Sequence, residues 1–137
     1  MSKEITVQVD VNEGIDKVWK AFTVAEDIMK WNHASDDWHC PKAKNDLKVG
    51  GKFCYTMASK DGKESFDFSG VYTEIEPLKL IAYKMDDGRK AEVVFASVEN
   101  ETAVFETFEL ENINPEEMQR QGWQAILNNF KKHVESI

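Results

Sequence analysis

Five strand patterns follow one another between residues 47 and 110, and this run constrains the fold more than any other feature of the sequence. Each is a short stretch of alternating or β-branched and aromatic residues, which is typical of strands. Turn signals such as Asp61-Gly62 and Asp86-Asp87-Gly88 keep the connections short. Parallel strands need crossovers of roughly a dozen residues, so these strands are expected to be antiparallel. They are predicted at residues 49–57, 66–75, 80–85, 91–98 and 102–110.

The rest of the chain supplies one more strand and three helices. Apolar residues alternate with polar ones over residues 5–11, which predicts a sixth strand. Apolar residues at helical spacing predict two short helices, at about 13–22 and 24–31. Residues 32–46 are polar and are expected to form a long loop. A helix of about 20 residues, roughly 30 Å long, is predicted over 115–135 and can cross a whole sheet.

The strand at 66–75 changes the parity of its apolar side chains partway along. Phe66 and Phe68 share one face, whereas Val71 and Ile75 have the opposite parity. A strand keeps both groups on one side only if an extra residue is absorbed in a bulge. The pair Ser69-Gly70 is the predicted place for that bulge.

These elements predict an α+β helix-grip domain over residues 1–137. Its sheet is expected to be curved, six-stranded and antiparallel, with two short helices between the first and second strands. A sheet with one apolar face must bury it, and only the C-terminal helix is long enough to cover it. A strongly curved sheet closes imperfectly around a helix, which favours a cavity between the two.

The balance of charge excludes several classes of partner. The 137 residues carry 17 basic and 25 acidic side chains, a net charge of -8, which disfavours nucleic acids and anionic membranes. No apolar run approaches the roughly 18 residues of a membrane span, and residues 1–5 show no secretory signal. A cytoplasmic monomer or homodimer is therefore expected, with Cys40 and Cys54 as free thiols. No cofactor is expected.

Aromatic side chains are distributed over all elements that would surround such a cavity. Small-molecule sites have mostly apolar walls with a few polar groups. The alternative is that the same rings simply fill the core. The residues predicted to bind a ligand are Trp31, Trp38, Phe53, Tyr55, Phe66, Phe68, Tyr83, Phe95, Glu106, Phe108, Trp123 and Phe130.

Glu106 is the least expected residue of this set. It has the strand parity of Val104 and Phe108 and is therefore predicted to point into the apolar face. Burial disfavours an ionised carboxylate, so its pKa is expected to be raised. It is a candidate ligand contact or general base. Alternatively, a neighbouring hydroxyl or Arg89 satisfies it, or the strand faces the other way.

The predicted loop at 32–46 contains residue types that can bind zinc, but their spacing fits no standard site. His39 and Cys40 are adjacent, and adjacent residues rarely converge on one ion. No metal is therefore expected, and Trp31, just before this loop, and Trp38 within it are the expected mouth of the cavity.

Several segments resemble the START-like superfamily, which includes polyketide cyclases and lipid-transfer domains. Within it, the sequence is most similar to the family homologous to the activator of the heat-shock chaperone's ATPase. His39 to Ala43 resembles a bacterial branch of that family. The segments that carry the resemblance are Val18 to Thr23, Trp31, Val49 to Phe53, Gly70 to Pro77 with Leu80 and Ile81, and Gly122 to Leu127.

The resemblance implies the helix-grip fold and leaves the function open, because this scaffold serves transport, sequestration and catalysis. The eukaryotic activators also work with an additional N-terminal domain that these residues do not include, so chaperone activation is not carried over.

Three functions remain open on the sequence. The preferred one is non-catalytic binding or carriage of a lipid-like or polyaromatic molecule inside the domain. A cyclase or hydrolase would need an acid–base pair in the cavity, with Glu106, His39 or a tyrosine as candidates. A stress-related, co-chaperone-like interaction module would need an exposed apolar patch in place of a deep cavity.

Overall fold

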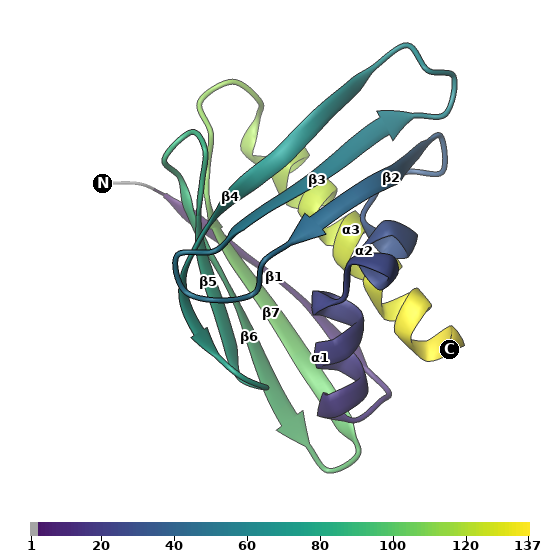
Figure 1. The fold of residues 1–137 in the computed structure, drawn as a ribbon, viewed down its shortest axis with the longest axis vertical. Coiled ribbons are helices and arrows are strands. Elements are labelled where there is room, and N and C mark those ends of the chain that lie inside the picture. The colour runs from purple at the N-terminus through teal and green to yellow at the C-terminus, as the bar shows by residue number, and fades with distance from the viewer. Residues whose placement is uncertain (1–2) are drawn as a thin grey trace.

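The computed structural model describes residues 3–137 and contains one curled antiparallel sheet of seven strands in the order β1-β7-β6-β5-β4-β3-β2 (Figure 1). Met1 and Ser2, which begin the segment without a secretory signal, lie outside the described residues. The predicted α+β helix-grip architecture is confirmed. The elements are β1 (Glu4–Val11), α1 (Ile15–Thr23), α2 (Ala25–Trp31), β2 (Trp38–Asn45), β3 (Lys52–Ser59), β4 (Ser65–Glu76), β5 (Leu80–Met85), β6 (Lys90–Val98), β7 (Glu101–Glu109) and α3 (Glu116–Ser136).

β2 lies where the sequence predicts a loop, so the expected count of six strands is wrong. The strand is at the edge of the sheet, where it pairs with β3. Its register shifts between His39 and Lys42, around Pro41. Proline cannot donate a ladder hydrogen bond and is tolerated at edges and bulges. A polar edge strand interrupted in this way has no regular alternation to recognise.

The bulge in β4 lies at Thr73 and not at the predicted Ser69-Gly70. β4 pairs with β3 without interruption across residues 65–71, whereas its register with β5 shifts between Tyr72 and Glu74. Tyr72 keeps the inward parity of Phe68 and is buried, with its ring 5.2 Å from that of Phe53. The side chains of β4 therefore keep the inward parity of Phe68 for four more residues, up to Tyr72, before the bulge.

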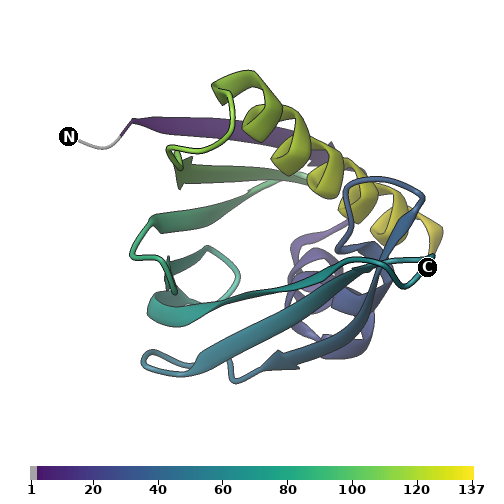
Figure 2. The same ribbon diagram turned by 90° about the horizontal axis from the view of Figure 1, so that it is seen from above.

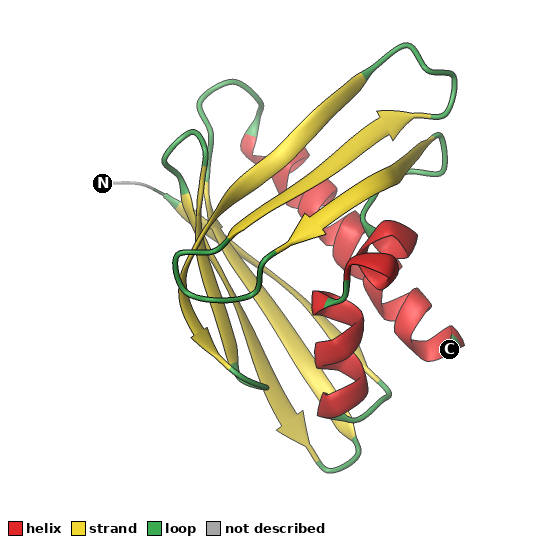
Figure 3. Ribbon diagram, viewed as in Figure 1, coloured by secondary structure: helices red, strands yellow, loops and turns green. Residues whose placement is uncertain are grey.

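The sheet curls so that its two ends are covered differently (Figures 2 and 3). α3 lies along β1 and β7, and its buried side chains Leu127, Phe130 and Val134 complete the core there. α1 and α2 pack beside the C-terminal half of α3. β3 and β4 stand on the far side of the curl from α3 (Figure 2). No helix among residues 3–137 is long and apolar enough to span a membrane.

Candidate functional site

A cavity of about 380 Å³ lies between the concave face of the sheet and α3. This volume falls within the roughly 300–1,000 Å³ of typical small-molecule sites. Phe66 and Met118 belong to its wall and are 52% and 58% exposed, so the cavity opens to solvent where β4 faces the first turns of α3. The wall consists of Phe22, Thr23, Trp31, Asn32, Phe53, Tyr55, Met57, Phe66, Phe68, Tyr72, Ile81, Tyr83, Arg89, Glu106, Glu111, Asn114, Met118, Gln119, Gly122, Trp123 and Ile126.

Most of the predicted ligand-binding residues lie in this wall, and their role in binding stays a prediction. Those in the wall are Trp31, Phe53, Tyr55, Phe66, Phe68, Tyr83, Glu106 and Trp123. The predicted residues that the wall does not include are Trp38, Phe95, Phe108 and Phe130. Phe95, Phe108 and Phe130 pack against other rings in the core, as the alternative of a filled core expects. Trp38 is half-buried on β2 and contacts the exposed ring of Phe66.

Phe108 illustrates how a ring behind the wall can still shape it. Its ring stacks on Trp123 with the centroids 4.1 Å apart and the planes 7° from parallel, and it is fully buried. Phe108 thereby holds the indole that faces the cavity. Phe130 packs in the same indirect way against Phe22 and Trp31, with centroids 5.2 and 5.0 Å away.

A chain of hydrogen bonds satisfies the polar groups on one side of the cavity. The hydroxyls of Tyr55 and Tyr72 are 3.3 Å apart, and that of Tyr72 donates to Oδ1 of Asn45. Nδ2 of Asn45 in turn donates to the backbone carbonyl of Thr23 at 2.7 Å. Burial raises the pKa of both tyrosines, so both stay neutral donors. These groups have partners within the protein and need none from a ligand.

Glu106 points into the cavity, as its strand parity predicts. On the concave face it lies in line with Val7 of β1, Val93 of β6 and Ile81 of β5, all of them apolar. The residue is only 8% exposed, and this burial raises the pKa of its carboxyl group to about 8. Among residues 3–137, nothing forms a hydrogen bond or ion pair with that group. The raised pKa is therefore confirmed, and the carboxyl group is neutral at pH 7.

Tyr83 is another polar side chain of the wall without a hydrogen-bond partner among the described residues. It lies on β5, is 8% exposed, and contacts the rings of Phe53 and Phe68 with centroids 5.1 and 6.2 Å away. Its hydroxyl forms no hydrogen bond within the described part of the chain. Burial is the main cause that raises the pKa of Tyr83, and the nearby Glu106 adds to it. The phenol is accordingly a neutral donor at physiological pH.

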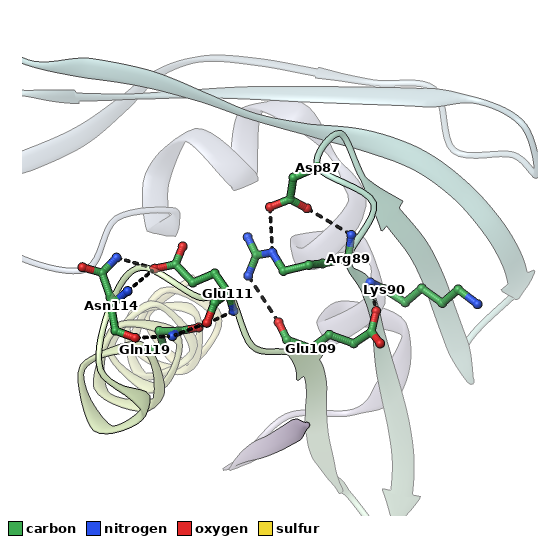
Figure 4. Close-up of polar contacts among 7 residues, drawn as sticks. All are labelled: Asp87, Arg89, Lys90, Glu109, Glu111, Asn114 and Gln119. Atoms are coloured by element: carbon green, nitrogen blue, oxygen red, sulfur yellow. Dashed lines mark hydrogen bonds and ion pairs between the residues drawn. The ribbon is translucent and has the colours of Figure 1, made fainter. Parts of the chain in front are cut away.

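Arg89 does not satisfy Glu106, which was one alternative. Its Nε donates to Oδ2 of Asp87 at 2.7 Å, and Nη1 donates to the backbone carbonyl of Glu109 at 3.2 Å (Figure 4). On the other side of the same view, Gln119 ties the loop after β7 to α3, because its Nε2 donates to the carbonyl of Asn114 at 2.8 Å. The polar residues that form this end of the wall are Arg89, Glu111, Asn114 and Gln119.

The sequence does not predict this polar end. Arg89, Glu111, Asn114 and Gln119 belong to turns or to the start of a helix, where hydrophobic periodicity carries no information about direction. Only the Asp87-Gly88 turn and the Asn114-Pro115 dipeptide indicate that two loops lie here. Their meeting at one end of a cavity follows from the curl of the sheet.

The segment with possible zinc-binding residue types does not contribute to the cavity. His39 is exposed on β2 and does not belong to the wall, so the enzyme alternative loses His39 and keeps Glu106 and the tyrosines of the wall as candidates. The thiol of Cys40 is buried and donates to the carbonyl of Lys42 at 3.4 Å, and both cysteines are free. In the part of the chain that the structure describes, no three His, Cys, Asp or Glu side chains are grouped as a metal site would require.

The comparisons with known proteins agree with this architecture. Residues 14–135 match the model of the family described as Activator of Hsp90 ATPase homolog 1-like protein. The solution structure of an AHSA1-like protein from Aeromonas hydrophila is 42% identical, with a TM-score of 0.93 over 98% of this chain and 93% of that one. None of the curated proteins matches.

Two further solved structures extend the likeness. A protein of Cytophaga hutchinsonii is 50% identical, with a TM-score of 0.83 over 97% of this chain and 92% of that one. A protein of Chromobacterium violaceum has a TM-score of 0.86 over 97% of this chain and 98% of that one, but only 21% identity, so it shares the fold alone.

Proposed function

We propose that this chain, which belongs to the family of Activator of Hsp90 ATPase homolog 1-like proteins within the START-like superfamily, binds a small, mainly apolar molecule in the cavity between its sheet and α3. The observation that carries the proposal is the cavity of about 380 Å³ with aromatic walls and an opening between Phe66 and Met118. Binding and carriage require no chemical step. The cytoplasm remains the expected location.

The apolar area of the wall supports binding over a surface interaction. A large ring that leaves water gains about 25 cal/mol for each Å² of apolar area, and aromatic pairs add geometry-dependent attraction. Trp123, Phe68 and Phe53 line the cavity from two sides, since Trp123 comes from α3 and the other two from the sheet. A planar or flexible apolar molecule can be enclosed between them. The interaction-module alternative called for an exposed patch instead of such a space.

Gly122 of α3 offers the sharpest test of this proposal. It belongs to the wall, and a Cβ atom placed on it would meet nothing within 4 Å. Leucine in its place would fill part of the cavity without clashing at the backbone. Gln121→Leu introduces the same side chain at an exposed position of the same helix and is the matched control.

The experiment measures thermal stabilisation and affinity with a panel of apolar mono- and bicyclic compounds. At a hundredfold excess over its dissociation constant, a ligand stabilises the folded state by about 2.7 kcal/mol. We expect binding to the wild type and to Gln121→Leu, and at least about tenfold weaker binding to Gly122→Leu, or about 1.4 kcal/mol. The proposal is wrong if no compound of the panel binds, or if Gly122→Leu binds as the wild type does.

A further inference from the structure

Two side chains that the sheet contributes to the cavity wall have polar atoms without any partner among the described residues. Glu106 and Tyr83 are each 8% exposed, and neither side chain forms a hydrogen bond among residues 3–137. Buried polar groups in native proteins almost always have partners, so each exception calls for an explanation. The hydroxyls of Tyr55 and Tyr72 in the same wall are bonded to one another, and that of Tyr72 also to Asn45. Among the wall residues that the sheet contributes, the lack of partners is thus confined to Glu106 and Tyr83; Asn32 after α2 and the indole nitrogen of Trp123 also form no side-chain hydrogen bond among residues 3–137.

The register of the sheet brings these two side chains to one patch. Tyr83 pairs with Ala91 of β6, which pairs with Phe108 of β7, so Glu106 stands two residues along β7 from the position opposite Tyr83. Side chains two residues apart on a strand share a face. Both therefore point to the concave side, across the small Ala91 and the apolar Val93. They are near enough for a charge on Glu106 to affect the ionisation of the phenol.

Arg89 is the fixed positive charge that acts on this pair: it partly offsets the rise in the pKa of Tyr83 that burial and Glu106 cause. β1 and β6 present Val7 and Val93 beside Glu106, and α3 faces the cavity with uncharged side chains such as Trp123. The charged members of the wall are Arg89 and Glu111, both in or next to the loops at its polar end. Arg89 is held there by Asp87 and by the carbonyl of Glu109. Near neutral pH the patch therefore consists of a phenol and a neutral carboxylic acid, and both can donate a hydrogen bond.

We propose that Tyr83 and Glu106 together receive an acceptor oxygen, of the kind found in a ketone, from an otherwise apolar ligand whose rings lie against Trp123 and Phe68. The proposal rests on the proposed function, because it names the chemical class that the cavity takes. Two neutral donors directed at one oxygen within an apolar site are a known way to hold a carbonyl or enolate oxygen, as in ketosteroid isomerase. A purely hydrocarbon ligand would leave both donors unpaired.

The test uses two probes of nearly the same shape, 2-acetylnaphthalene and 2-isopropylnaphthalene. Only the first carries an acceptor oxygen. The quantity measured is the ratio of the affinity for 2-acetylnaphthalene to the affinity for 2-isopropylnaphthalene. When this ratio is compared between protein variants, the difference in how water solvates the two probes cancels. In the wild type this ratio includes the hydrogen bonds to Tyr83 and Glu106. A net hydrogen bond changes affinity by about tenfold.

Tyr83→Phe and Glu106→Leu each remove one donor and are expected to lower the ratio by about tenfold, through the acetyl compound alone. Glu106→Gln keeps a donor of the same length and is expected to keep the ratio within about threefold. Tyr55→Phe removes a hydroxyl that is bonded within the wall and is the matched control, with an unchanged ratio. Tyr83→Phe deletes a single unpaired hydroxyl and is expected to keep the fold, so it tests the proposal even if Glu106→Leu rearranges the cavity. Amide NMR spectra of each variant show whether its fold is kept.

Each result separates the two proposals. If neither probe binds the wild type, the proposed function fails first. If both bind but the ratio is the same in Tyr83→Phe and Glu106→Leu as in the wild type, the cavity is a binding site and the inference about the oxygen is wrong. A third probe, 2-naphthylmethylammonium, tests the opposite charge state. Tighter binding of this cation than of 2-acetylnaphthalene, lost in Glu106→Gln, would overturn the inference in favour of an amine site.

Discussion

Replacing Glu106 by glutamine should make the protein more stable, and by an amount that depends on pH. In the folded protein the pKa of this carboxyl group is raised from 4.5 to about 8 because it is buried among apolar side chains. Between these values the folded state holds a proton that the unfolded state has lost. Stability contributed by the protonated group therefore falls as pH rises from about 4.5 to about 8 and is constant above that. Glutamine has no proton to lose, so the variant lacks this decline.

The size of the effect follows from the shift. Each pKa unit corresponds to 1.36 kcal/mol, so the full shift from 4.5 to about 8 sets an upper limit of about 5 kcal/mol on the pH-dependent loss. Between pH 6 and pH 8 the wild type should lose about 2 kcal/mol relative to Glu106→Gln. Every ionisable group other than Glu106 is present in both proteins, so its contribution cancels in the difference. At pH 6 the amide replaces a neutral acid of the same shape, so the offset there is small.

The assay is chemical denaturation of both proteins at half-unit steps from pH 6 to pH 9, with the free energy of unfolding compared at each step. Glu64→Gln, at an exposed position, is the control and should follow the wild type. An independent measurement is the ¹³C shift of the Glu106 carboxyl carbon, which should titrate with a midpoint near 8. A difference between Glu106→Gln and wild type that stays constant over this range, or a midpoint below 5, would refute the reasoning.

Two further predictions concern packing. In Gly70→Ala the new methyl would overlap the carbonyl oxygen of Lys84 and come within 3.0 Å of the Phe53 ring. Denaturation should therefore show that the free energy of unfolding falls by about 1–3 kcal/mol or more. Gly14→Ala, whose methyl would meet nothing within 4 Å, is the control. Phe108→Ala should cost about 3–5 kcal/mol, since Phe108 is fully buried under Trp123. Equal losses at these two glycines, or a loss below about 1 kcal/mol for Phe108→Ala, would contradict the packing described.

The sequence predicts the elements whose side chains alternate regularly between core and solvent. In β7 the buried residues Thr102, Val104, Glu106 and Phe108 follow each other at every second position. Because the parity of such a strand can be read directly, the inward direction of a carboxyl group could be predicted along with that of its neighbours. On α3, the three- and four-residue spacing of the apolar side chains assigns Trp123 to the inner side of the helix in the same way.

What the sequence does not predict depends on neighbours that are distant in the chain. β2 exists because β3 offers it an edge, and its own polar, proline-containing sequence carries no signal of a strand. The bulge at Thr73 is set by the burial of Tyr72 against Phe53, which lies 19 positions earlier. The hydrophobic pattern also does not predict which rings line the cavity and which are covered by another ring. Phe108 and Phe68 have similar inward parity, yet only Phe68 lines the cavity.

The unpaired polar groups of Glu106 and Tyr83 lower the stability of the empty domain but would raise its affinity for a ligand. Leaving a buried donor without a partner costs about 1–3 kcal/mol, and an apolar residue at either position would avoid that cost. The ring of Tyr83 belongs to the hydrophobic core, but the fold does not need its hydroxyl or the carboxyl group of Glu106, because neither polar group bonds to the core residues around it. A ligand oxygen would remove the cost only while it is bound, so the free energy lost in the empty domain returns as affinity and selectivity. This relation explains why two unpaired polar groups occur together on the sheet side of the cavity wall.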